Sequence, residues 1–166
     1  MSDADYSLGS VQVALSPRER FDEFLRSRGK RTTRQRQLIV GQVCSRHEHF
    51  DAEQLIDSLK SSGEGRVSRP TVYRTLTELV DAGLLRKMVL AGRAVYEHDY
   101  GYPQHDHLYC TSCQTLIEFS SDEIVRIRDA VASLHRFRAQ SHRLIVSGLC
   151  AACRSRRSTS RRTDRV

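Results

Sequence analysis

The stretch Ser68-Arg-Pro-Thr-Val-Tyr-Arg-Thr-Leu-Thr-Glu-Leu-Val-Asp-Ala-Gly83 contains the signals of a complete helix. Ser68 can cap this helix, which we predict to run to about Ala82 and to stop at Gly83. Apolar residues recur at helical spacing and form an inward stripe, namely Val72, Leu76, Leu79 and Val80. Arg69, Tyr73 and Thr77 follow the same spacing on the other face. We therefore expect one buried face and one face that is open to a partner.

Three helices are expected before this stretch. Ser16 followed by Pro17 is typical of a helix start, and Thr33 can cap the next helix. Asp51 and Gln54 resemble a capping box at the start of the third. The stretch quoted above is then the fourth helix of the chain.

A β-hairpin is predicted after the fourth helix, with strands at 85–90 and 93–97 around Ala91-Gly92. Short helices followed by a hairpin predict a winged helix-turn-helix whose fourth helix reads DNA. Helices and a hairpin could also form a plain interaction module, and the pattern alone leaves that alternative open.

The second half of the chain predicts a small α/β unit. Its expected elements are strands around 108–110, 115–119 and 143–149 and a helix at about 121–135. About 50 residues are too few for a secure hydrophobic core. The unit should therefore need a bound metal, a partner subunit, or both.

Composition and charge favour an intracellular protein that binds a polyanion. The net charge is +7, and basic residues gather in a cluster without an intervening acid, at Arg26, Arg28, Lys30, Arg31, Arg34 and Arg36. A solvated surface is the alternative explanation of that cluster. No apolar run is long enough for a bilayer, and residues 1–10 lack a signal-peptide pattern. We expect a cytoplasmic protein without a membrane partner.

Two CxxC pairs give the strongest chemical signal, Cys110 with Cys113 and Cys150 with Cys153. One tight turn can present both sulfurs of a pair to the same ion, and Zn(II) prefers four tetrahedral ligands. All four positions would be filled by protein, so we predict a structural zinc. The alternatives are a redox pair or free thiols.

His105 and His107 form a second candidate site. They alternate in an extended segment, so both side chains can face the same way. His49, Glu97 and Glu118 are candidates to complete a mixed nitrogen and oxygen shell, which suits Fe(II), Mn(II), Co(II) or Zn(II). Surface histidines without a metal are the alternative.

The run His105-Asp-His-Leu-Tyr-Cys-Thr-Ser-Cys113, followed by Ile117-Glu-Phe119, resembles the hallmark of the ferric uptake regulator family. Upstream, Thr71-Val-Tyr-Arg-Thr-Leu76 is similar to the recognition helix of that family. His49-Phe-Asp-Ala-Glu53 and Thr33-Arg-Gln-Arg36 resemble its third-helix and second-helix entries. The likeness covers about residues 17–153, in order.

The resemblance implies an α+β protein with two functional domains. A winged-helix DNA-binding domain would span residues 16–99 and a hinge 100–104. An α/β dimerisation and metal-binding domain with the structural zinc would span 105–153. Residues 1–15 and the basic tail 154–166 would be disordered. The regulatory metal would bind at the hinge through five ligands, His49, Glu97, His105, His107 and Glu118.

The resemblance also implies double-stranded DNA as the partner. Tyr73 and Arg74 would face the groove, because Tyr can contact thymine methyl groups and Arg can reach guanine or phosphate. Arg31 and Arg36 would contact phosphates. A homodimer, with a tetramer as the alternative, would read an inverted repeat that is expected to be AT-rich.

The sequence departs from the family pattern at two places. Many members carry a third metal site whose matching positions here are Gln104, Asp106, Val125 and His142. Only Asp106 and His142 keep metal-ligating side chains, so the third site should be weak or missing. One additional residue lies between Glu97 and His105 relative to some members, which makes His98 the alternative ligand to Glu97.

We therefore predict a metal-responsive transcriptional repressor and no enzymatic activity. Glu at both 97 and 118, where peroxide-sensing relatives tend to have Asp, favours Fe(II) sensing and control of metal uptake genes. A zinc-, manganese- or peroxide-sensing member of the family is the alternative. Two alternatives of other classes are a metalloenzyme that uses His105 and His107, and a zinc-stabilised module without sensing.

Overall fold

A computed structural model describes residues 11–46, 48–63 and 65–156 of the chain. The described residues form two compact units that divide between Tyr102 and Pro103, inside the segment predicted to be a hinge. Among the described residues, no helix combines the length and the apolar character that crossing a membrane requires.

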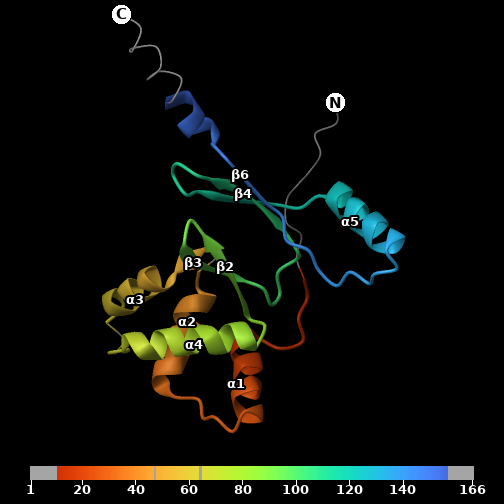
Figure 1. The fold of residues 1–166 in the computed structure, drawn as a ribbon. Coiled ribbons are helices and arrows are strands. Elements are labelled where there is room, and N and C mark those ends of the chain that lie inside the picture. The colour runs from red at the N-terminus through yellow and green to blue at the C-terminus, as the bar shows by residue number, and fades with distance from the viewer. Residues whose placement is uncertain (1–10, 47, 64, 157–166) are drawn as a thin grey trace, which may run out of the picture. The chain divides into compact units, whose positions relative to one another are not determined.

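The N-terminal unit is a winged helix, as the sequence predicts (Figure 1). Its helices and strands are α1 (Pro17–Ser27), α2 (Arg34–Cys44), β1 (Phe50–Asp51), α3 (Ala52–Ser61), α4 (Arg69–Asp81), β2 (Leu85–Leu90) and β3 (Arg93–His98). The strands form an antiparallel sheet in the order β1-β3-β2. The hairpin turns at Ala91 and Gly92, with φ angles of 48° and 78° that match the twist of a two-residue hairpin loop.

The predicted caps start all four helices. The Ser16 and Asp51 side chains form capping boxes with Glu19 and Gln54, and Thr33 caps α2. Ser68 accepts a hydrogen bond from the N–H of Thr71 at the start of α4. Four short side chains thus set where each helix begins.

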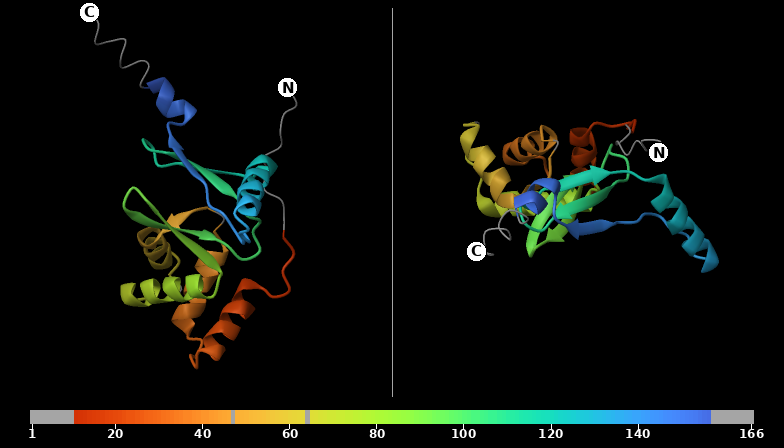
Figure 2. Two further views of the ribbon diagram at one scale, coloured as in Figure 1. Left: turned by 45° about the vertical axis from the view of Figure 1, so that its right-hand side comes forward. Right: turned by 90° about the horizontal axis from the view of Figure 1, so that it is seen from above.

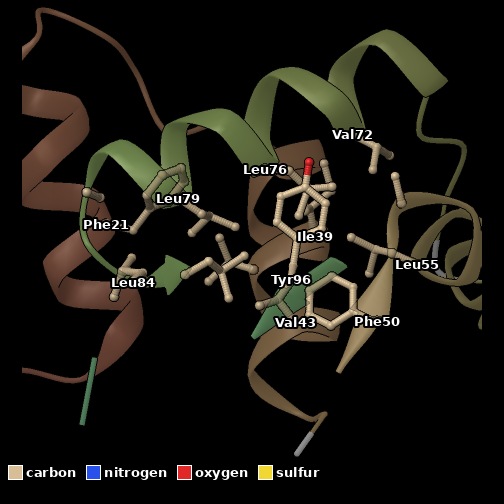
Figure 3. Packing of buried hydrophobic residues seen from close by; sticks show 14 of the residues in the cluster. Phe21, Ile39, Val43, Phe50, Leu55, Val72, Leu76, Leu79, Leu84 and Tyr96 are labelled. Carbon is tan, nitrogen blue, oxygen red and sulfur yellow. The ribbon is translucent and has the colours of Figure 1, made fainter. Parts of the chain in front are cut away.

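The core lies between these helices and the sheet (Figure 3). Phe21 of α1, Ile39 of α2, Leu55 of α3 and Leu76 of α4 point into it and are almost fully buried. The inward stripe predicted for α4 is confirmed, with Val80 partly buried at its edge. This packing fixes α4 against its neighbours, so its other face is held in one orientation.

A buried ion pair that the sequence did not predict joins α4 to α2. Glu78 is 4% exposed, and the Arg36 guanidinium donates to both of its carboxylate oxygens at 3.0 Å. Lys30 Nζ donates to Oε1 at 2.7 Å. Burial alone would raise the pKa of Glu78, but the hydrogen bonds from Lys30 and Arg36 outweigh it, so this pKa lies below its ordinary value.

The geometry gives Arg36 a structural role that the sequence did not predict. Its guanidinium also donates to the carbonyl of Arg31 at 2.8 Å, so Glu78 and the backbone hold most of its hydrogen-bond donors. Arg36 therefore joins α2 to Glu78 of α4, and its contact with phosphate stays a prediction. Arg31 is exposed.

The C-terminal unit contains β4 (Asp106–Cys110), β5 (Leu116–Phe119), α5 (Asp122–Leu134) and β6 (Ile145–Gly148). Its sheet has the order β5-β4-β6, with β4 antiparallel to β5 and parallel to β6. In Figures 1 and 2, α5 lies beyond the end of this sheet, and none of its residues is buried. The unit thus leaves much of its apolar surface uncovered, as its small size predicts.

The ends of the chain differ in part from the prediction of disorder. Residues 151–156 are helical, with the N–H of Arg154 donating to the carbonyl of Cys150 at 2.9 Å. The basic tail predicted to be disordered from Arg154 therefore begins inside a helix. Residues 11–15 belong to no helix or strand, and the rest of both predicted segments, 1–10 and 157–166, lies outside the described residues.

Replacing Glu78 with Gln should destabilise the N-terminal unit by about 2–3 kcal/mol, less than for a fully buried pair because Lys30 is half exposed. Because the folded-state pKa is lowered, the stabilisation is present above about pH 4.3 and is lost as the pH falls through the folded value. Urea unfolding at several pH values should show the difference between the proteins shrinking in acid. Exposed Glu23, replaced with Gln, is the control; equal losses in the two variants would contradict the prediction.

Candidate functional site

The four cysteines of the CxxC pairs converge at one end of the C-terminal sheet. Cys110 ends β4, Cys113 lies before β5, Cys150 follows β6, and Cys153 lies in helix 151–156. Their sulfur atoms all lie within 4.8 Å of one another, and Cys113 Sγ is 3.7 Å from Cys150 Sγ. Sulfurs at about 2.3 Å from a tetrahedral ion would be about 3.8 Å apart. The cluster therefore fits one four-coordinate metal ion.

Local hydrogen bonds prepare two of these thiols, Cys110 and Cys113, to bind a cation. Backbone N–H groups of Cys113 and Cys150 lower the pKa of Cys110 to about 6. The Thr115 hydroxyl, 3.1 Å from Cys113 Sγ, lowers the pKa of Cys113. A lowered pKa favours the thiolate, which is the form that binds metal. The four side chains leave no coordination position open, so the site suits a structural metal.

His105, His107 and Glu118 lie together in the C-terminal unit. His107 pairs with Glu118 across β4 and β5, and the rings of His105 and His107 are 5.0 Å apart. His105 Nε2 is 3.9 Å from Glu118 Oε1. The alternation seen in the sequence thus puts two imidazoles and one carboxylate side by side.

The His105 ring is oriented by a backbone carbonyl group two residues earlier in the chain. Its Nδ1 is 2.9 Å from the carbonyl oxygen of Pro103. A carbonyl can only accept, so Nδ1 carries the proton and the lone pair of the neutral ring is on Nε2. Metal-binding histidines commonly have this arrangement, because the second nitrogen fixes the tautomer.

His49 and Glu97 form a second ligand pair, within the N-terminal unit. His49 Nε2 is 3.0 Å from Glu97 Oε2. His49 directly precedes β1, and the β1–β3 register pairs Phe50 with Tyr96, which brings the next residues on either side together. β1 is only two residues long, and no sequence pattern predicted it. The strand nevertheless positions this ligand pair.

His98, the alternative to Glu97, has another role in this structure. Its Nε2 is 2.7 Å from the carbonyl oxygen of Arg46 and 3.1 Å from that of Val43. Both oxygens are acceptors, so Nε2 donates and helps to cap the end of α2. The side chain is half-buried and stacked on Tyr102. The geometry therefore favours Glu97 as the ligand.

The positions of the third site form a hydrogen-bonded cluster. His142 Nε2 is 3.0 Å from Asp106 Oδ2, and the Gln104 amide nitrogen is 2.5 Å from His142 Nδ1. Val125 on α5 provides no ligand atom. Asp106 and His142 do meet, but they bind each other.

The outer face of α4 carries the residues expected to read DNA. Tyr73 is 46% exposed and Arg74 is also exposed, so Tyr73 is not a core aromatic. The Tyr73 hydroxyl donates to Glu53 Oε1 at 3.0 Å, which raises the pKa of Tyr73. Arg69 pairs with the same carboxylate. Glu53 and Arg69 therefore belong to this surface, and neither was predicted as a site residue.

Comparison with known proteins agrees with this architecture. The model of the "Ferric uptake regulator family" matches residues 27–147. A ferric uptake regulation protein of Synechococcus elongatus is 36% identical over 132 residues, which are 78% of this chain and 89% of the relative. The crystal structure of the Vibrio cholerae ferric uptake regulator is 31% identical with a TM-score of 0.67, covering 78% of this chain and 98% of that chain.

The chain belongs to the ferric uptake regulator family. It is therefore a metal-responsive regulator with the winged-helix and α/β architecture of that family. A structure of a zinc-bound manganese uptake regulator is 34% identical with a TM-score of 0.59, covering 78% of this chain and 98% of that chain. Family membership by itself thus does not specify the sensed metal.

Replacing Cys113 with Ser should remove the metal from the cysteine cluster, because the three remaining thiols no longer fill a tetrahedral shell. Metal analysis of the purified protein should show the loss of one equivalent, and circular dichroism should show partial unfolding of the C-terminal unit. Replacing Cys44, which lies outside the cluster, with Ser should leave the metal content unchanged. Full metal content in the Cys113 variant would contradict the assignment.

Proposed function

We propose that this protein is an Fe(II)-responsive repressor of metal uptake genes. One ion would take ligands from both units: His49, Glu97, His105, His107 and Glu118. The observation that carries the proposal is that each unit presents its own group of imidazole and carboxylate ligands. The His49–Glu97 pair and the His105–His107–Glu118 group lie on opposite sides of the Tyr102–Pro103 division.

The donor set supports a divalent first-row ion. Imidazole and carboxylate ligands suit Fe(II), Mn(II) and Zn(II), and the intrinsic affinities of these ions follow a fixed order, so selection in cells depends on geometry and supply. Glu at both 97 and 118 favours iron sensing over peroxide sensing. Mn(II) and Zn(II) sensing, and peroxide sensing through oxidation of a histidine ligand, are the alternatives within the family. Zn(II) is proposed for the four cysteines.

The proposed mechanism is a population shift. An ion that binds both ligand groups stabilises the arrangement of the units that brings them together, and the ion must bind that arrangement more tightly than any other. Moving an equilibrium from 1:99 to 99:1 needs roughly 5.5 kcal/mol of differential affinity. Five ligands shared between two units are a reasonable source for this energy.

The DNA partner is proposed from the surface of α4. Tyr73 and Arg74 would lie in the major groove, Arg31 would contact phosphate, and the targets would be AT-rich inverted repeats. Arg69 shares the surface and would exchange its partner Glu53 for phosphate. A cytoplasmic location is part of this proposal.

A homodimer is proposed from the apolar surface of the C-terminal unit. Leu108 pairs with Ile117 on one side and Val146 on the other, so these exposed side chains are neighbours across the sheet. α5 and the residues after it expose further apolar side chains, which are Ile127, Val131, Leu134 and Phe137. Contiguous apolar surface of this kind is typical of an interface between subunits. A tetramer is the alternative assembly.

Replacing His105 with Ala should abolish the metal dependence of DNA binding. We expect Fe(II) or Mn(II) to raise the affinity of the wild-type protein for DNA by about 10- to 100-fold, a usual size for coupled binding. The measurement is a gel shift with a duplex selected from a random pool by the metal-loaded wild-type protein, after mild chelation.

The matched control is His135→Ala, because His135 is exposed at the end of α5 and belongs to no ligand group. This variant should respond to metal as the wild type does. Equal DNA affinity with and without metal in the wild-type protein would favour the zinc-stabilised module without sensing and would refute the proposal.

Replacing Val131 with Asp should weaken dimerisation by at least about 100-fold, because the interface would have to bury a carboxylate in each subunit. Sedimentation velocity over a range of protein concentrations measures this effect. Ser133→Asp adds the same charge to an exposed position of the same helix and is the control. If the two variants dimerise equally well, α5 is not in the interface.

A further inference from the structure

A cluster of four polar side chains joins three segments of the C-terminal unit. Asp106 begins β4 and Gln104 lies two residues before it, Arg128 comes from α5, and His142 from the segment before β6. Asp106 is 2% exposed and the side chains of His142 and Arg128 are 16% and 24% exposed. Arg128 Nη1 lies 3.2 Å from His142 Nδ1, a contact that the sequence did not predict.

The proton positions in this cluster follow from its partners. The Gln104 amide nitrogen is 3.0 Å from the carbonyl oxygen of His142, so it must be a donor there, and it also approaches His142 Nδ1. A guanidinium can only donate, so Nδ1 of His142 is an acceptor. His142 therefore carries its proton on Nε2, which donates to Asp106 Oδ2 at 3.0 Å. The other Asp106 oxygen accepts from the N–H of Leu144 at 3.0 Å.

We propose that Arg128 is a built-in cation that takes the place of a metal ion in this cluster, so that the C-terminal unit is latched here without metal. The guanidinium is held by Asp129, whose Oδ1 is 2.8 Å from Arg128 Nε, and it is directed at the imidazole. Both nitrogens of His142 are already used, one as donor and one as acceptor. A divalent cation at Asp106 and His142 would have to approach the positively charged guanidinium of Arg128, which repels it.

The contacts of Arg128 stabilise the position of α5, which has little buried apolar surface to fix it. No residue of α5 is buried, and the helix lies beyond the end of the sheet in both figures that show it. The contact from Arg128 to His142, and from there to Asp106, ties the helix to β4. Arg128 lies one helical turn after Val125, the α5 position that matches the third metal site of the family.

Removal of the guanidinium tests the latch. Arg128→Ala in the zinc-loaded full chain should increase amide hydrogen exchange in α5 by at least about tenfold and lower the Tm by about 5 °C. Arg126→Ala removes an exposed arginine of the same helix that contacts Glu123 and the carbonyl oxygen of Asp122, both within α5, and it should leave both quantities near the wild-type values. Equal behaviour of the two variants would overturn the proposal.

Charge reversal tests the exclusion of metal. Co(II) absorption is followed while the zinc-loaded protein is titrated. The His105→Ala background removes the signal expected from the proposed regulatory site. In that background we expect no further Co(II) equivalent for the parent protein, one equivalent after Arg128→Glu, and none after Arg126→Glu.

The two proposals fail in different ways in this titration. A Co(II) equivalent that the parent binds and that His142→Ala removes would show an open metal site and overturn the latch. A folded Arg128→Glu variant that binds no Co(II) would show that the guanidinium is not what excludes metal, and would overturn it as well. Failure of the regulatory site alone would appear as an unchanged titration when His105→Ala is compared with wild type.

Discussion

The four-sulfur cluster is the constraint on which the C-terminal unit depends. Its sheet has three short strands and its helix buries no residue, so apolar packing alone cannot hold the parts together. Cys110 and Cys113 flank the turn between β4 and β5, while Cys150 and Cys153 follow β6. One ion bound by these sulfurs would crosslink all three strands at the same end, and this would stabilise the part of the sheet that carries His105 and His107.

The N-terminal unit is held together mainly by apolar packing. Its helices bury a continuous apolar core, and the Glu78 ion pair closes the contact between α2 and α4. That rigidity has a functional meaning, because α4 presents Tyr73 and Arg74 from a fixed scaffold. The same unit holds the His49–Glu97 pair next to β1 and on β3. A change at these two residues therefore acts on the same unit that carries α4.

In our interpretation, two kinds of cation stabilise the C-terminal unit. The thiolates bind a permanent metal, and Arg128 provides a permanent charge at the Asp106–His142 cluster. Neither responds to the metal supply. Only the imidazole and carboxylate groups near the division of the chain remain to sense a change, and this would concentrate regulation at one site, since the other parts of the unit are already saturated.

The sequence by itself determined the helices, the wing, the cysteine site and the family, because these follow from local signals: caps, periodicity and paired motifs at fixed spacing. It also listed the histidine and glutamate ligands through the family resemblance. Only the tertiary structure decided their partners. β1 is too short to leave a pattern, Arg36 turned out to serve Glu78, His98 caps α2, and Arg128 reaches His142. Such contacts join residues that are far apart in the chain. Local signals in a sequence do not indicate which distant side chains come into contact.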